Sequence, residues 1–268
     1  MLVRRLEDAP VEEWHRLRTH VLMEAGELGS RNLSVTWLSL PAGAEQTLRS
    51  QEESEQAYVV VRGEGTMFSS GMDSGDLAAI GEDPEQLREW REQILAIWNL
   101  CERMPKPTIA QIHGACLGGA AELALACDLR VVADDAVIGL VETRVGLLPD
   151  LGGCSRLPAI VGLGRAKELI MCSKFVDGTE AERIGLANRV APLAELDAAT
   201  DLLVGELLTC APLPVGLAKG IIDASALPAL EETLEQEVTA QELCATSEDF
   251  REGVRAFAER RPPEFHGR

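Results

Sequence analysis

The sequence predicts an α/β fold with a helical C-terminal region. Two observations support this prediction: β-rich apolar runs alternate with helical segments between residues 57 and 140, and helical spacing dominates after residue 155. Hydrophobic residues make up 46% of the 268 residues, which excludes general disorder and supplies a sizeable core. The length corresponds to one or two domains.

The elements of the first half follow in order. Residues 1–57 show weak helical periodicity, except for a strand-like run at 34–40. The apolar run AYVVVRG at 57–63 predicts a buried strand, and the Gly/Ser-rich run at 64–77 predicts a loop. Further strands are predicted at 107–114, 129–133 and 136–140, and helices at 83–103 and 117–128.

The second half is predicted to be a helical layer. Apolar residues recur there at helical spacing. The predicted helices cover residues 163–172, 178–186, 193–210, 213–225, 229–245 and 247–260.

Charge and composition exclude several classes of function. The chain has 44 acidic and 25 basic residues, a net charge of −19, which argues against a nucleic-acid partner. No long apolar run or secretion signal is evident, so we expect no membrane partner and a cytoplasmic location. Seven scattered Cys predict reduced thiols, and four His without ligand spacing predict no metal site.

Two Gly-rich turns follow predicted strands and could bind an anion. The first is SSGMD, which ends at Asp73, and the second is GACLGGAAE, residues 114–122. Backbone N–H groups at the start of a helix are free to stabilise an anion or a developing oxyanion. The P-loop and GxGxxG patterns are absent from these turns, so a nucleotide site is poorly supported.

Three carboxylates accompany the second turn. Glu122 lies one helical turn after Gly119, Glu142 follows a predicted strand, and Asp150 comes eight residues later. Such a group suits proton transfer next to a carbonyl. The alternatives are ordinary surface acids, a Gly118–Gly119 pair that serves helix packing, and an Asp150 that caps a helix entered near Gly152. Asp128 has the same alternative of a turn or capping residue.

At these residues the chain resembles the enoyl-CoA hydratase/isomerase (crotonase) superfamily. The matching stretches occur in family order and spacing and together cover about residues 58–268. They are RGEGTMFSSGMD (62–73), KPTIAQIHGACLGGAAELALACDLRVVADDAVIG (106–139), ETRVGLLPDLGG (142–153), GRAKELIMCSKFVDGTEAERIGLANRVAP (164–192) and AFAERRPPEF (256–265).

The resemblance implies a spiral of ββα turns over residues 58–195 and a helical trimerisation region over 196–268. It implies a homotrimer or hexamer that acts on an acyl-CoA thioester, with coenzyme A as part of the substrate and no separate cofactor. The N–H groups of Ser70 and Gly119 would polarise the thioester carbonyl. Glu122 would be the base that helps water attack the β-carbon, and Glu142 the acid that protonates the α-carbon.

The resemblance also implies further contacts with the substrate. The first Gly-rich turn and Gly118 of the second would contribute to binding. Phe257 and Arg260 match family positions that touch the coenzyme, often across a subunit boundary. Because the chain is so acidic, the coenzyme phosphates need a local cationic patch, for which Arg255, Arg260 and Arg261 are the candidates. The predicted substrate-binding residues are Gly71, Met72, Asp73, Gly118, Phe257 and Arg260.

The reaction type has three candidates. The presence of both Glu122 and Glu142 favours hydration of a 2-enoyl thioester. An acid at Asp150, together with one at Glu142, also occurs in family isomerases, so a double-bond isomerase is the runner-up and Asp150 an accessory acid. The third candidate is a catalytically impaired acyl-CoA-binding protein.

The front of the chain departs from the family pattern. Family members open with a strand pair, an NRPxxxNAL-like segment and a helix, and residues 1–57 lack a match. Residues 34–67 resemble instead the front of a cupin barrel, with Arg49 and Gln51 at its metal-ligand His positions, so that only Glu55 remains and no metal is expected. We therefore expect 1–57 to be a graft in place of the first spiral turn. The alternative is a divergent family N-terminus, in which 34–63 would form two strands of the spiral sheet.

Overall fold

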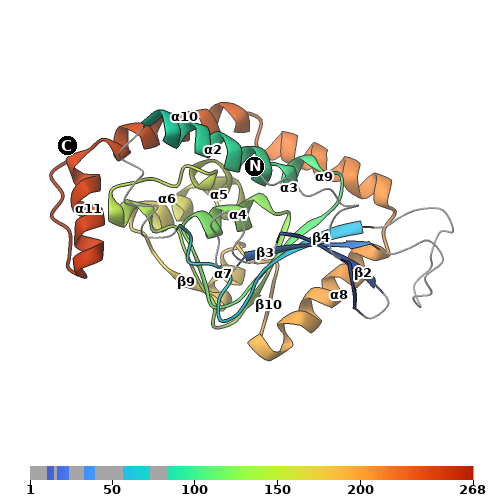
Figure 1. The fold of residues 1–268 in the computed structure, drawn as a ribbon. Coiled ribbons are helices and arrows are strands. Elements are labelled where there is room, and N and C mark those ends of the chain that lie inside the picture. Colours follow the sequence, from blue (N-terminus) through green and yellow to red (C-terminus); the bar gives the residue numbers. More distant parts are fainter. Residues whose placement is uncertain (1–10, 15–16, 24–32, 40–56, 73–83, 268) are drawn as a thin grey trace.

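The computed structural model describes the backbone of residues 11–14, 17–23, 33–39, 57–72 and 84–267, and the side chains of 58–72 and 87–267. In these residues, two sheets are covered by helices and a helical region follows them along the chain (Figure 1). The predicted α/β class is therefore confirmed. Of the predicted site residues, Asp73 lies outside the described residues, as do Arg49, Gln51 and Glu55.

The larger sheet has seven strands in the order β1-β2-β3-β4-β5-β7-β10. Neighbours from β1 to β4 pair antiparallel, whereas β4, β5, β7 and β10 pair parallel. Residues 58–61 of β4 and all of β5 are buried, as expected for strands that have partners on both edges and layers on both faces. The bounds are Val11–Trp14, Leu17–Met23, Leu33–Ser39, Ala57–Gly63, Thr108–Ile112, Leu129–Ala133 and Arg189–Ala191.

The smaller sheet consists of β6 (Ala115–Leu117), β8 (Val137–Gly139) and β9 (Val176–Asp177). Its β6 also bridges in parallel to Ser69. Twice between residues 108 and 161, the chain adds a strand to the larger sheet, a strand to the smaller sheet, and then a helix, as in β5–β6–α4 (Gly119–Ala126). Further along, β9 of the smaller sheet precedes β10 of the larger one. This is the predicted ββα spiral.

Strands β3 and β4 are neighbours in the larger sheet, as the alternative to the graft hypothesis expects. Residues 33–39 and 57–63 are adjacent strands of the spiral sheet, with Trp37 opposite Val59. The buried strand β4 needs a partner on its outer edge, and β3 supplies it. The same sheet continues to β1 and β2, so residues 11–14 and 17–23 are strands, which their weak helical periodicity does not indicate. The pairing is antiparallel, so β3 and β4 are not related as the parallel strands of the later turns are.

The predicted helices are present with small shifts in their bounds. Helix α2 lies beside α10 (Figure 1), where Arg88 donates to Glu235 and Glu242, each at 2.6 Å. The helices besides α4 are α2 (Pro84–Trp98), α3 (Leu100–Arg103), α5 (Gly153–Val161), α6 (Leu163–Met171), α7 (Gly178–Arg183), α8 (Leu196–Leu208), α9 (Pro212–Ala226), α10 (Leu230–Ala245) and α11 (Glu248–Glu259), with short 3-10 turns η3 (Glu142–Val145) and η4 (Leu193–Glu195).

Within the described residues, no single helix is long and apolar enough to cross a membrane. The stretch Leu193–Leu208 and helix α9 reach that length and composition only as a pair, and they meet at a bend of 104°.

A buried ion pair attaches α9 to the start of β5. Lys219 donates to the Asp128 carboxylate at 2.7 Å, and its side chain is only 7% exposed. The same Asp128 oxygen accepts the backbone N–H and the hydroxyl of Thr108, each at 2.7 Å. Asp128 is therefore a structural anchor, in line with the capping alternative considered for it.

Replacement of Asp128 should strongly destabilise the fold. Asp128→Ala leaves the Lys219 ammonium buried without its counter-charge, and we expect a loss of about 3–5 kcal/mol in the free energy of unfolding, measured by urea denaturation. Glu168→Ala, which breaks the exposed pair of Glu168 with Lys174, is the control and should leave the midpoint nearly unchanged. Equal effects of the two substitutions would contradict the anchor.

Candidate active site

The N-terminus of α4 is the first part of the site. Gly118 precedes the helix with a φ of 56°, and Gly119 is the first helical residue, so the Gly119 N–H has no acceptor within the helix. The Ser69 bridge brings the first Gly-rich turn alongside, and a methyl group added at Gly71 would lie 3.6 Å from the Gly119 nitrogen. The structure thus brings together the segments of Ser70, Gly71 and Gly119.

Glu122 lies one turn into α4 and is 1% exposed. Its Oε1 accepts the backbone N–H groups of Leu151 at 2.7 Å and Gly153 at 2.9 Å. These donors belong to the start of α5, whose dipole also favours a negative charge there. Glu122 is therefore a buried, held carboxylate, and the surface alternative is wrong for it.

Glu142 begins η3, on the other side of Gly118. A methyl group added at Gly118 would lie 3.1 Å from Glu142 Oε1, so the Gly pair leaves room for this carboxylate beside α4. Both carboxylate oxygens of Glu142 are buried, and among the described residues only the backbone amides of Val141 and Glu142 itself act on them, without a well-formed hydrogen bond. Buried polar atoms are normally paired, so two acceptors without a well-formed hydrogen bond indicate a place for a ligand or water.

Asp150 lies beside this pair but has a partner of its own. It is 2% exposed and forms an ion pair with the guanidinium of Arg91, which reaches it from α2 and is 3% exposed. The sequence analysis did not identify Arg91. The alternative in which Asp150 caps the following helix has no support in the structure, because its side chain faces Arg91 instead.

Burial raises the pKa values of the two glutamates, Glu122 and Glu142. Burial, and then the charge of Asp150, raise the pKa of Glu142 to about 7. Burial and the charges of Glu142, Asp150 and Glu237 raise the pKa of Glu122 well above its usual range, while its amide hydrogen bonds act against the shift. Two adjacent buried carboxylates cannot both ionise easily, so we expect the pair to keep one proton near neutral pH. The amide donors favour Glu122 as the ionised member.

Glu237 is a fourth buried acid, which the sequence analysis missed. It comes from α10, is 5% exposed, and accepts hydrogen bonds from Gly152 and Ser155 at the start of α5. Burial raises its pKa to about 7. The spacing of charged residues on α10 resembles an ordinary solvated face, so no local signal marked this residue.

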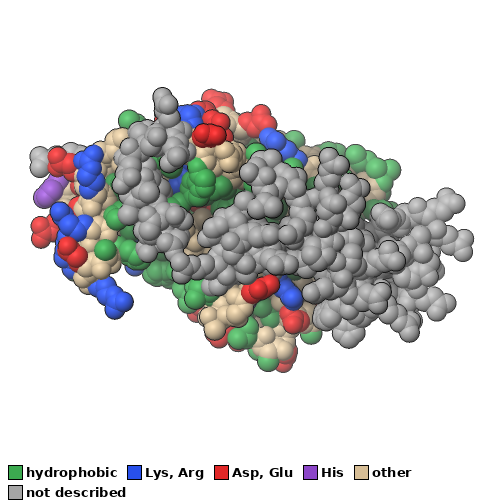
Figure 2. All heavy atoms as spheres, in the orientation of Figure 1, with side chains coloured by type: hydrophobic (Ala, Val, Ile, Leu, Met, Phe, Trp, Pro, Cys, Tyr) green, Lys and Arg blue, Asp and Glu red, His purple; other side chains and the backbone are tan. Residues whose placement is uncertain are grey.

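The C-terminal candidates are exposed at the end of α11, a helix whose middle packs against η3 where Gly253 meets Val145. Phe257 is 60% exposed, and Arg260, also exposed, ends α11 in the left-handed conformation. Charges of both signs gather at this end of the molecule (Figure 2). Arg255 and Arg261 both pair with Glu252, so the positive charge of the predicted cationic patch is partly neutralised.

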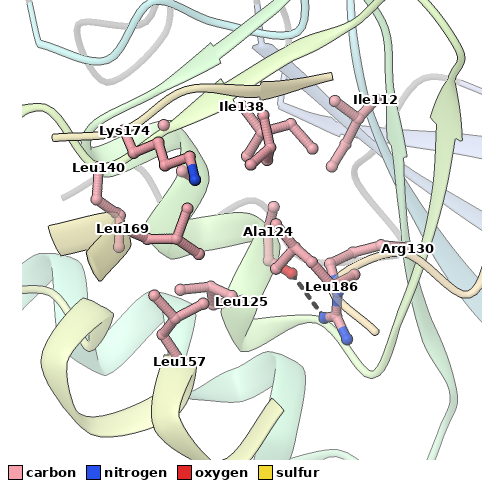
Figure 3. Close-up of a pocket in the computed structure, with 13 residues that line it drawn as sticks. Ile112, Ala124, Leu125, Arg130, Ile138, Leu140, Leu157, Leu169, Lys174 and Leu186 are labelled. Atoms are coloured by element: carbon pink, nitrogen blue, oxygen red, sulfur yellow. Dashed lines mark hydrogen bonds between the residues drawn. The ribbon is translucent and has the colours of Figure 1, made fainter. Parts of the chain in front are cut away.

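A cavity of about 20 Å³ lies at the opposite face of α4, where Ala124 and Leu125 line it (Figure 3). Its walls are nearly all apolar, and none of the predicted site residues lines it. It has room for about one water molecule and is too small for an acyl group.

The comparisons agree on one family. The sequence model of the enoyl-CoA hydratase/isomerase family matches residues 42–268, and so begins within the segment 1–57. A "Probable enoyl-CoA hydratase" of Bacillus subtilis (strain 168) is 35% identical over 78% of this chain and 81% of its own. The rat "Methylglutaconyl-CoA hydratase, mitochondrial" is 35% identical over 89% and 76%. The crystal structure of an enoyl-CoA hydratase from Mycobacterium avium subsp. paratuberculosis K-10 superposes with a TM-score of 0.69 at 29% identity, over 77% and 79%.

Replacement of Glu142 should stabilise the protein at high pH. A folded-state pKa of about 7 against an ordinary 4.5 means that ionisation of Glu142 costs stability as pH rises through this interval. Glu142→Gln removes this cost, so at pH 8 the variant should be more stable by on the order of 3 kcal/mol, with the gain vanishing below pH about 4.5. Urea denaturation at both pH values measures it. A variant less stable than the native protein at pH 8 would contradict the assigned burial.

Proposed function

The chain belongs to the enoyl-CoA hydratase/isomerase family, and we propose that it is a 2-enoyl-CoA hydratase, which adds water across the 2,3 double bond of an acyl-CoA thioester. The observation that supports this most is the pair Glu122 and Glu142 beside the free N-terminus of α4, one held by amides and the other without a well-formed hydrogen bond to the described residues. Relatives named as hydratases support the same reaction.

The first part of the proposed mechanism concerns the thioester carbonyl. The N–H groups of Ser70 and Gly119 would donate to its oxygen, while Gly71 and Gly118 keep side chains out of the way. Attack at the β-carbon places negative charge on that oxygen as an enolate forms. Donors already fixed by the fold stabilise this charge without reorganisation, typically by several kcal/mol.

The second part concerns the water and the protons. Glu122, ionised and held by two amides, would accept a proton from the attacking water, whose oxygen bonds to the β-carbon. Glu142 would deliver its proton to the α-carbon, and the proton taken up by Glu122 restores the singly protonated pair. A pKa of about 7 for Glu142 suits an acid that works near neutral pH.

The alternative reaction is a double-bond shift, for which Asp150 would be the accessory acid. The ion pair with Arg91 ties up the Asp150 carboxylate and so favours hydration. A catalytically impaired acyl-CoA-binding protein is the other alternative, and the antiparallel front of the sheet is the observation that favours it. A 3-enoyl thioester converted to the conjugated 2-enoyl form faster than the latter is hydrated would establish the isomerase.

We also propose that the chain assembles as a homotrimer or hexamer. Helix α9 exposes a row of large apolar side chains, which a monomer rarely leaves to water. In the oligomer, Phe257 and Arg260 would contact the coenzyme across a subunit boundary. Sedimentation equilibrium that returned the single-chain mass of 28.9 kDa would contradict this assembly. The exposed row is Leu213, Leu217, Ile221 and Ile222, each 60–71% exposed.

Both glutamates should be essential for hydration. Glu122→Gln and Glu142→Gln each remove a proton-transfer group without changing its shape, and each should lower kcat for crotonyl-CoA by at least ~100-fold. Loss of the conjugated thioester absorbance measures the rate. The exposed Glu168→Gln is the matched control. Hydration unchanged in either site variant would show that its assigned role is wrong.

A further inference from the structure

One backbone segment, residues 151–155, contacts two buried carboxylates from different helices. Leu151 and Gly153 donate their N–H groups to Glu122 of α4, at 2.7 and 2.9 Å. Gly152, between them, donates to Glu237 of α10 at 2.7 Å. Successive amides thus point alternately to the two acids, so neither carboxylate can move without moving this segment.

Glu237 makes further contacts that fix the same segment. Its Oε1 accepts the Ser155 N–H at 2.6 Å and also the Ser155 hydroxyl, while Oε2 takes the Gly152 N–H. Arg156 adds a bond from the side, since its Nη1 donates to the Leu151 carbonyl at 2.9 Å. Both Glu122 and Glu237 therefore bind this segment, but Glu237 does not belong to the proposed catalytic pair Glu122 and Glu142.

We propose that Glu237 is a positioning residue for Glu122, acting through the backbone of residues 151–155. The inference rests on the proposed hydratase function for its kinetic consequence, but the geometric claim does not need turnover. Held by Glu237, the Leu151 and Gly153 amides present a fixed pair of donors to the base. A displacement of about 1 Å in such a site can cost ~100-fold in rate.

The charge of Glu237 also affects the pKa of Glu122. Glu122 faces Glu142 of η3, Asp150 with its partner Arg91 of α2, and Glu237 of α10; Glu237 also has the Cys154 thiol and Arg156 of α5 nearby. Arg156 is already paired with Glu102. The charge of Glu237 is one cause of the raised pKa of Glu122, so its removal should let the Glu122–Glu142 pair lose its proton at lower pH.

A purely structural role is the competing explanation, because a carboxylate at a helix start stabilises the helix. Asp177 offers a matched control. It accepts the Glu180 N–H at 2.7 Å as the cap of α7, and it is exposed. Asp177→Asn and Glu237→Gln therefore both weaken a carboxylate cap, but only the second touches the segment that holds Glu122.

The kinetic test uses the full-length protein and crotonyl-CoA. Glu237→Gln keeps one acceptor oxygen and should lower kcat by ~10-fold with KM nearly unchanged, and Glu237→Ala by ~100-fold. In Glu237→Gln the high-pH limb of the kcat profile should move to lower pH by about one unit. Asp177→Asn should leave both kcat and the limb unchanged. A Glu237→Gln enzyme whose stability falls while its kcat and pH profile match the native protein would overturn the proposal.

A second readout separates this inference from the proposed function. The carboxyl group of Glu122 is titrated by carbon NMR in protein labelled at glutamate side-chain carboxyls, with the resonance assigned by its absence in Glu122→Gln. We expect a lower apparent pKa of Glu122 in Glu237→Gln and no change in Asp177→Asn. If the native protein fails to hydrate crotonyl-CoA but this shift appears, the proposed function fails and the coupling stands. If the native protein is active and the shift is absent, the coupling fails alone.

Discussion

The hydrogen bonds from Leu151 and Gly153 to Glu122 are the contacts on which the site depends. A carboxylate that is 1% exposed is stable as an anion only if donors replace the water it has lost. The start of α5 supplies them, and Gly153 must be glycine, since a methyl group there would lie 2.4 Å from Pro149 Cβ. The meeting of α4 and α5 is therefore fixed by a buried charge as well as by packing.

The spiral explains how residues far apart in the chain meet there. Each turn places the end of a small-sheet strand next to the start of a helix, so the glycines after β6, η3 after β8, and the start of α5 lie together. The antiparallel front, β1 to β4, extends the larger sheet at the edge opposite β10. Strand β3 covers the outer edge of β4, while Glu122, Glu142 and Asp150 all lie on elements that follow β5 in the chain.

Much of this arrangement could be predicted from the sequence, for identifiable reasons. Long apolar runs such as 57–63 and 107–114 specify buried strands, and Gly118, Gly119 and Glu122 form a compact local pattern. Strands β6, β9 and β10, of two or three residues, are too short to show a period. Arg91 and Glu237 lie on polar helices and acquire their roles only through tertiary contacts, so local sequence could not distinguish them from solvated charges.

We propose that the carboxylates of Glu122 and Glu142, beside the α4 N-terminus, add water to a conjugated thioester. The most direct test is the mass of the product formed from crotonyl-CoA by the purified protein in water labelled with heavy oxygen. Hydration predicts a product heavier than the substrate by one labelled water, formed far more slowly by Glu122→Gln. A product of unchanged mass, or substrate that binds and is recovered unaltered, would contradict the account.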